Sequence, residues 1–217
     1  MNLGNRITTL SMIFAVALSW ATVVQAAGNA DAGKAQAAAC GACHGQDGAT
    51  PIDPTYPNLA GQNEKYLFNQ LQMIQDNSRN IPLMAGQLNG KSEQDLADLA
   101  AYYASLPTKV SQAGGEDEAI AKAASIYRAG IARKGVAACS ACHSPDGSGN
   151  ALAGFPQLSG QPAAYTTAQL KAYRERNRAT DEAYGGMMRG VAEGLTDTEI
   201  ALVADYLQGL NLSLIHI

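Results

Sequence analysis

Two copies of one pentapeptide constrain this chain more than any other feature. All four cysteines of the 217-residue sequence fall in Cys-Gly-Ala-Cys-His at 40–44 and Cys-Ser-Ala-Cys-His at 139–143. The spacing C-x-x-C-H is the signature of covalent c-type haem attachment, in which both cysteines become thioethers and the histidine binds the iron. The sequence therefore predicts two haem c groups, each containing iron. The expected thioether residues are Cys40, Cys43, Cys139 and Cys142, and the expected proximal ligands are His44 and His143.

Two other uses of closely spaced cysteines fit the chain less well. A structural zinc site needs four ligands, whereas Cys40, Cys43 and His44 supply three and no further cysteine or histidine lies nearby. A thioredoxin-type dithiol needs a strand–helix–strand setting, and short runs rich in Val, Ile, Thr and aromatic residues are absent. Covalent haem attachment therefore explains the two motifs best.

The N-terminal segment has the pattern of a secretory signal. A basic residue, Arg6, precedes an apolar run that starts near Leu10, and small residues lead up to Ala26. This pattern predicts a signal peptide cleaved after Ala26, with an uncleaved membrane anchor as the alternative. Secretion implies an oxidising compartment, but haem uses all four cysteines, so no disulfide is expected.

Internal repetition divides the remaining chain into two halves. A shift of 99 residues superposes the two haem motifs and continues as far as Arg79 and Arg178, and beyond them a shift of 104 superposes Met84 on Met188. The last residues of the chain read as a translated sequencing adapter and are left out of fold reasoning together with His216. The predicted segments are a signal peptide at 1–26, a first domain at 27–107, a linker at 108–116, a second domain at 117–211 and an adapter artefact at 212–217.

Each half is expected to be helical, which makes the fold class all-α. Helix-capping sequences begin at Ser92 and Thr196, and the apolar residues that follow them recur at i, i+3, i+4 and i+7. Pro107 ends the last helix of the first half and Gly209 that of the second. The expected helices cover residues 33–39, 64–75 and 93 onward in the first half, and 118–129, 164–174 and 197 onward in the second.

Composition excludes two other classes of protein. With 47% apolar and 16% charged residues, the chain is too apolar to be disordered. Its net charge of −4 and the absence of a basic stripe argue against nucleic acid as a partner.

The sixth iron ligand can be argued by elimination. Because both natural histidines are already proximal ligands, a second histidine is not available to either iron. Of the methionines beyond the signal peptide, Met84 and Met188 match each other in the repeat, each in a loop before the last helix. A thioether opposite imidazole stabilises ferrous iron and raises its potential. We therefore predict Met84 and Met188 as the second axial ligands, with Met187 as the alternative to Met188 and Met73 as a core residue.

The sequence resembles the diheme cytochrome c4 family, whose members contain two class I cytochrome c domains in tandem, each wrapped around one covalently bound haem. The resemblance rests on the two haem motifs, on Tyr-Pro-Asn-Leu-Ala-Gly-Gln at 56–62, on Gly-Phe-Pro-Gln-Leu at 154–158 and on the residues from Met188 to Leu195. It implies a periplasmic electron carrier that receives electrons from a quinol–cytochrome c reductase or a dehydrogenase and delivers them to a terminal oxidase. A loose association with the membrane is left open.

The same resemblance assigns roles to two pairs of residues in the repeat. The carbonyls of Pro57 and Pro156 should accept a hydrogen bond from the proximal histidines, which fixes the ring and its basicity. Within the family the haem edges meet at the domain interface, so Arg79 and Arg178 either pair with haem propionates or lie on the surface in solvent.

Two function classes compete on the residues alone. The first is a non-enzymatic electron carrier in which each iron is closed by a histidine and a methionine. The second is a diheme oxidoreductase of the peroxidase or thiosulfate-oxidising type, or an electron-transfer subunit of a dehydrogenase. An enzyme needs an open iron position and an acid–base residue, but the repeat supplies a methionine for each iron and no further histidine. The carrier is therefore the favoured prediction.

Overall fold

The computed structural model describes residues 27–109 and 111–210. The expected signal peptide at 1–26 and the adapter segment at 212–217 lie outside these residues. The first half contains α1 (Ala30–Gln36), α2 (Ala38–His44), α3 (Glu64–Gln75), η1 (Pro82–Met84) and α4 (Glu93–Ser105). The second half contains α5 (Asp117–Ala129), η2 (Ala132–Lys134), α6 (Ser140–His143), α7 (Ala163–Arg174), η3 (Ala179–Tyr184), α8 (Met187–Glu193) and α9 (Asp197–Gly209).

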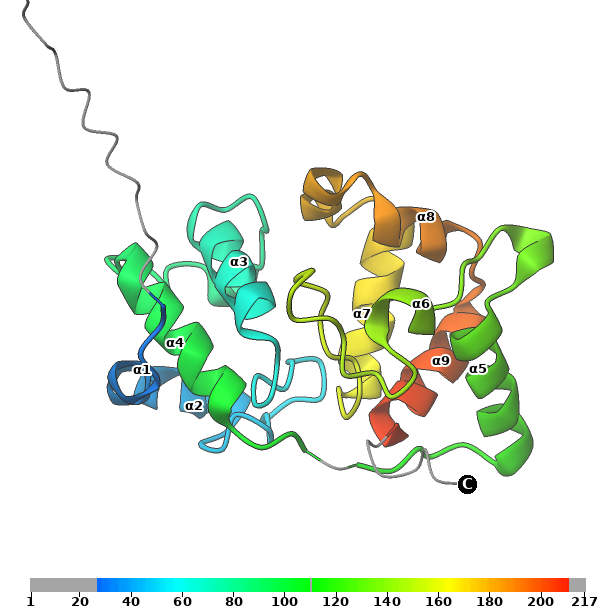
Figure 1. Cartoon of the computed structure of the whole chain (residues 1–217), viewed down its shortest axis with the longest axis horizontal. Helices are drawn as coiled ribbons and strands as arrows, with labels where there is room; N and C mark the ends of the chain where they lie inside the picture. The colour runs from blue at the N-terminus through cyan, green and yellow to red at the C-terminus, as the bar shows by residue number, and fades with distance from the viewer. Residues whose placement is uncertain (1–26, 110, 211–217) are drawn as a thin grey trace, which may run out of the picture.

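The all-α prediction is confirmed for the part of the chain that the structure describes. Isolated bridges, Ile131 with Val136 and Asn150 with Phe155, are the β-type pairings found there. Figure 1 shows the two halves side by side, with the chain between α4 and α5 crossing along one edge of the molecule. Within residues 27–109 and 111–210, no helix is both long enough and apolar enough to cross a membrane.

Local signals in the sequence place the main helices. Ser92 caps α4 and Thr196 caps α9, each by a reciprocal capping box with the acidic residue three positions later. The helix expected at 64–75 is α3 with the same bounds. The helix expected at 33–39 is in fact two helices, α1 and α2, which meet at Ala37. The second of these helices, α2, carries the first haem motif.

A glycine contact fixes how α1 crosses α4. Gly33 is buried, and a Cβ atom built on it would lie 2.0 Å from the backbone carbonyl oxygen of Asp98. Because that oxygen belongs to the backbone of α4, it cannot turn away as the end of a side chain could. The two helices therefore approach as closely as they do only because residue 33 has no side chain.

Each half has its own apolar core, built from the stripes predicted on its last helix. In the first half Leu99, Ala100 and Tyr103 of α4 pack against α2 and α3. The second core is larger, and it adds residues of α5 and of the turn before the second haem motif. Its fully buried members include Tyr127, Ile200, Val203 and Leu207.

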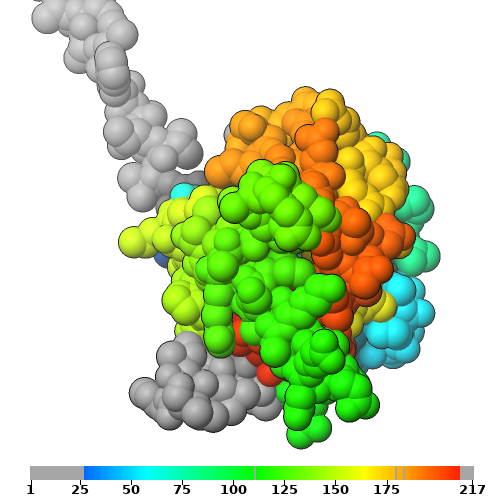
Figure 2. All heavy atoms as spheres, turned by 90° about the vertical axis from the view of Figure 1, so that its right-hand side faces the viewer, coloured from blue at the N-terminus to red at the C-terminus, as the bar shows by residue number. Residues whose placement is uncertain are grey.

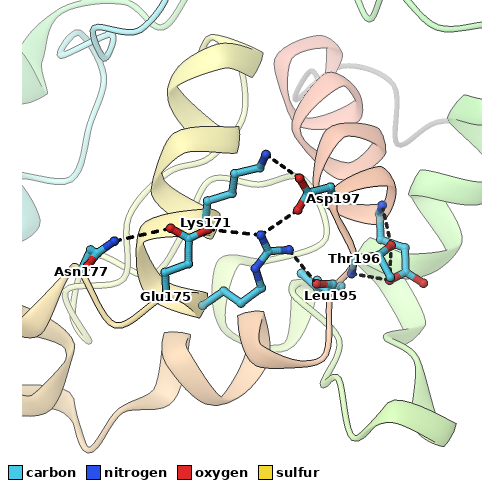
Figure 3. A network of polar contacts seen from close by, with 8 residues as sticks. Lys171, Glu175, Asn177, Leu195, Thr196 and Asp197 are labelled. Atoms are coloured by element: carbon cyan, nitrogen blue, oxygen red, sulfur yellow. Dashed lines mark hydrogen bonds and ion pairs between the residues drawn. The ribbon is translucent and has the colours of Figure 1, made fainter.

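Polar contacts tie α7 to the start of α9 (Figure 3). Asp197 accepts from Lys171 at 2.8 Å and from Arg174 at 2.7 Å, and Arg174 also donates to the carbonyl of Leu195 at 3.1 Å. Asp197 is largely exposed, so these ion pairs add little stability. In Figure 2, which views the second half from its outer end, α5 and the residues after it form the front, beside α8 and α9.

A reciprocal pair of glutamine contacts joins the two halves. The side chain of Gln161 donates to the carbonyl of Asn58 at 2.8 Å and accepts from its N–H at 3.1 Å. Gln62, its equivalent in the repeat, makes the same two bonds with the backbone of Gln157 at 2.9 and 2.8 Å. All four residues are buried. We call these contacts the glutamine clamps, and they join the two halves by hydrogen bonds from a glutamine side chain of one half to the backbone of the other.

Candidate haem sites

Each haem motif ends a short helix whose last residue is the buried histidine. His44 closes α2 and His143 closes α6, and they are 8% and 5% exposed. The chain then turns sharply through a residue of positive φ, which is Gly45 (φ 82°) in the first half and Ser144 (φ 67°, ψ 155°) in the second. A serine in this region is strained, because the conformation is otherwise nearly restricted to glycine. After this turn the chain runs away from the motif, and the imidazole ring lines the cavity.

Backbone carbonyls fix the proton and the orientation of both rings. The Nδ1 of His44 lies 3.0 Å from the carbonyl oxygen of Pro57, and that of His143 lies 2.9 Å from the oxygen of Pro156. A carbonyl only accepts, so Nδ1 carries the hydrogen and Nε2 keeps its lone pair free to bind a metal. Burial lowers the pKa of both histidines, more than these hydrogen bonds raise it, so the rings are neutral at physiological pH.

Met84 and Met188 each follow the haem motif of their own half by 40 residues or more in the sequence, but they line the same cavity as the motifs. Met84 ends η1, and Met187 and Met188 begin α8; all three line the cavity. Met73 is not among the lining residues and lies within α3. Met187 is 45% exposed, whereas Met84 and Met188 are half-buried.

The expectation that Met188 lies in a loop is wrong, because it lies in the first turn of α8. The carboxylate of Asp181 accepts from the backbone N–H of Met188 at 3.1 Å and from that of Arg189 at 2.7 Å. Gly185 and Gly186 adopt left-handed conformations just before the helix and allow the turn into it. Asp181 thus satisfies N–H groups that the first turn would leave unpaired, which makes a short helix stable here.

A single cavity of about 1130 Å³ connects both sites. Its walls carry the four cysteines, the two proximal histidines and the apolar side chains of both cores. None of these four cysteines forms a disulfide, so all four sulfurs are available for thioether bonds. Among the residues that the structure describes, no three His, Cys, Asp or Glu side chains gather to hold a bare metal ion. Thiols, an imidazole lone pair and flat apolar walls in each half fit a covalently attached haem.

The two arginines of the repeat are buried, so the alternative of solvated surface side chains is wrong. Arg79 and Arg178 are each 8% exposed and line the cavity between the halves.

Residue-by-residue reading of the sequence also missed the clamp residues Asn58, Gln62 and Gln161. The signal that could have found them was present, because Gln62 and Gln161 match in the 99-residue register.

Two helical domains in tandem, each with a C-x-x-C-H motif and an inward, carbonyl-bound histidine beside an apolar cavity, define a diheme c-type cytochrome. The cytochrome c family matches residues 30–107 and again residues 120–211. The chain belongs to the cytochrome c4 family, and it carries two covalently bound haem c groups and transfers electrons rather than catalysing a reaction on a substrate.

Known relatives support this assignment over most of the chain. The chain is 44% identical to cytochrome c4 of Pseudomonas aeruginosa over 189 residues, which cover 87% of this chain and 92% of that protein. The crystal structure of reduced recombinant cytochrome c4 from Pseudomonas stutzeri superposes with a TM-score of 0.81 at 43% identity, covering 85% of this chain and 100% of that one. The "thiosulfate dehydrogenase electron acceptor" of Thiomonas intermedia is 36% identical and covers 95% of this chain and 90% of that protein.

Proposed function

We propose that each half binds its iron between one histidine and one methionine, His44 with Met84 and His143 with Met188. The observation that carries this proposal is the free Nε2 lone pair of each ring in a cavity that Met84 and Met188 also line. Cys40 and Cys43, and their repeat partners, form the thioethers. Haem iron with these two axial ligands exchanges one electron at a raised potential.

The chain's own residues do three things for this exchange. The carbonyls of Pro57 and Pro156 hold the imidazoles in one tautomer and orientation, so the ligand does not rearrange when the iron changes charge. The apolar walls exclude water. The glutamine clamps keep the two sites at a fixed separation, which suits the passage of an electron from one to the other.

The ligand assignment is tested by replacing methionines one at a time. Met84→Ala and Met188→Ala should each remove the sulfur-to-iron charge-transfer absorption of one oxidised haem and leave the other haem unchanged. Met187→Ala is the matched control, since this side chain adjoins Met188 but is 45% exposed. If Met187→Ala removes the absorption and Met188→Ala does not, the assignment in the second half is wrong.

At the level of the pathway, the proposed role is a periplasmic carrier that delivers electrons to a terminal oxidase of a respiratory chain. The secretory pattern of residues 1–26 supports export, and the match to cytochrome c4 relatives supports a redox protein that exchanges electrons with partner proteins. The test is to mix reduced protein with membranes that contain a terminal oxidase and follow reoxidation by absorbance. Oxidase-dependent reoxidation that cyanide blocks is the expected result, and none above the rate of autoxidation contradicts the proposal.

A second candidate role is electron acceptor for a periplasmic dehydrogenase. Two relatives named as thiosulfate dehydrogenase electron acceptors favour it, at 36% and 33% identity. The test is to mix oxidised protein with purified thiosulfate dehydrogenase and thiosulfate. Reduction at a rate that saturates with the cytochrome supports this role. Both roles are compatible, since the dehydrogenase reduces the carrier and the oxidase reoxidises it.

A further inference from the structure

The peptide group that holds the first proximal histidine is also bonded by the other half. The carbonyl oxygen of Pro57 lies 3.0 Å from Nδ1 of His44. The N–H of the same peptide group belongs to Asn58, and it donates to Oε1 of Gln161 at 3.1 Å. One planar group therefore accepts a hydrogen bond from a histidine of the first half and donates one to a glutamine of the second half.

The second haem site repeats this arrangement with the halves exchanged. Nδ1 of His143 lies 2.9 Å from the carbonyl oxygen of Pro156. The N–H of that peptide group belongs to Gln157, and it donates to Oε1 of Gln62 at 2.8 Å. Each proximal histidine is therefore linked, through one peptide group, to a glutamine of the opposite half. We call these two chains of hydrogen bonds the crossed relays.

The crossed relays are shielded from water and held in place. Both histidines and both glutamines are buried. Each glutamine also donates from Nε2 to the carbonyl of the residue whose N–H it accepts, at 2.8 Å for Gln161 and 2.9 Å for Gln62. Two contacts keep the glutamine oxygen on the peptide N–H. Where water does not compete, consecutive hydrogen bonds are stronger and polarise one another.

This polarisation has a defined direction at the histidine. A peptide N–H that donates a hydrogen bond shifts electron density toward the oxygen of the same group, because the two are conjugated. That oxygen becomes a stronger acceptor for Nδ1–H, and the ring becomes more basic at Nε2, the atom left free to bind iron. A more basic ligand stabilises the ferric state more than the ferrous state, so the reduction potential falls.

We propose that Gln161 and Gln62 are positioning residues that lower the reduction potential of the haem in the opposite half. Gln161 acts on the haem that His44 binds, and Gln62 acts on the haem that His143 binds. Each glutamine acts through the shared peptide group. The inference rests on the proposed binding of iron by the two histidines. It follows that neither half sets its own potential alone, because each relay exists only while the halves are docked.

The test is Gln161→Leu in the full-length holoprotein, because leucine fills a similar volume but cannot accept the N–H of Asn58. In proton–nitrogen NMR of the reduced protein, we expect the Nδ1–H resonance of His44 to move to lower chemical shift and that of His143 to stay. The first haem should become easier to reduce, by about threefold in the ratio of reduced to oxidised haem at a fixed ambient potential. Loosening of the interface alone would admit water, which stabilises the more charged ferric state and would lower that ratio.

Two further variants make the test specific to the relays. Gln62→Leu should give the reverse result, with the resonance of His143 and the potential of the second haem changed and those of the first half kept. Asn69→Ala is the matched control, because Asn69 donates to the hydroxyl of Tyr184 in the other half at 2.9 Å. This change removes a contact between the halves that belongs to neither relay, so both resonances and both potentials should stay at their wild-type values.

Gln161→Glu keeps the experiment decisive if Gln161→Leu does not fold. Glutamate has the same length, and burial favours its neutral form, which keeps both contacts with Asn58 through a weaker carbonyl acceptor. At mildly acidic pH we expect a smaller shift of the His44 resonance in the same direction and none for His143. A His44 resonance that is unchanged in the folded variants, or a first haem that becomes harder to reduce in Gln161→Leu, would overturn the proposal.

The wild-type spectrum tests the proposed ligation separately. An imidazole bound to haem iron lies over the macrocycle, whose ring current moves the imidazole ring protons strongly upfield. Upfield ring protons for both His44 and His143, together with unchanged Nδ1–H resonances in the glutamine variants, would contradict the relays alone. Ring protons at ordinary positions would contradict the ligation itself.

Discussion

Replacing Gln161 with alanine tests how strongly the glutamine clamps hold the two halves. In the wild type this side chain satisfies both the N–H and the carbonyl of Asn58, which is 5% exposed. The substitution leaves two buried backbone groups without partners, and each such group costs roughly 1–3 kcal/mol. Allowing for some entry of water, we expect a loss of about 3 kcal/mol in the free energy of unfolding.

That loss should be visible as a lower melting temperature. For a chain of this length, about 1 kcal/mol corresponds to roughly 2–4 °C, so Gln161→Ala should melt about 10 °C lower in differential scanning calorimetry of the oxidised holoprotein. Gln62→Ala, the change at the equivalent position, should cost a similar amount because it leaves the backbone of Gln157 unpaired in the same way.

The double variant separates a shared interface from two independent contacts. Once one clamp is lost and the interface loosens, water can reach the groups of the other clamp. Gln62→Ala with Gln161→Ala should therefore cost clearly less than the sum of the single losses, and its melting curve should split into two transitions. Gln94→Ala is the control, since this exposed glutamine bonds only within α4. A wild-type melting temperature for Gln161→Ala would refute the reasoning.

Three further outcomes follow from contacts within each half. Gly33→Ala should lower the free energy of unfolding by about 2 kcal/mol because its Cβ would meet the backbone of α4, whereas Gly190→Ala, with no atom within 4 Å, should raise it by about 0.5 kcal/mol; denaturant titrations in which both changes stabilise would contradict this. Ser144→Gly relieves the strain of a positive φ but also removes the hydrogen bond from the Ser144 hydroxyl to the carbonyl of Gly149 at 2.7 Å, so we expect a net change of less than about 1 kcal/mol, and a calorimetric midpoint lowered by more than about 5 °C would contradict that. The hydrogen bond from Lys134 is the main cause that lowers the pKa of Glu199 from 4.5 to about 2. The stability that ionised Glu199 contributes is therefore complete above pH 4.5 and is lost as the pH falls through 2. Glu199→Gln should flatten the acid limb of the stability profile, and an unchanged limb would contradict the assignment.

The sequence was sufficient for the features that depend on nearby residues. Capping at Ser92 and Thr196 is decided within four residues, and the haem motif within five, so both could be read directly. The break of the first helix at Ala37 could not, because nothing in the local sequence forbids a continuous helix there.

The internal repeat helped to predict contacts only where both residues of a contact lie within the same half. When two residues match in the repeat, the match indicates that they have the same structural role, but it does not show which residue each of them contacts. For Pro57 the partner is His44, 13 residues away, and a local reading is enough. For Gln62 the partner is the backbone of residue 157, 95 residues away in the other half. The sequence alone shows that Gln62 has a matching residue in the repeat, but it does not show that its contact lies in the other half.

Where the halves differ, repetition gives no guidance, and the structure shows why this matters for the irons. Five extra residues separate Arg178 from Met188 compared with the first half, and Asp181 lies within that stretch. Its carboxylate starts α8 and so turns the loop expected before the last helix into a helix. The first half has Pro82 and a short 3-10 turn before its methionine instead. The glutamine clamps join the two halves through equivalent contacts, whereas the supports before Met84 and Met188 differ. We therefore expect a redox titration to resolve two separate potentials.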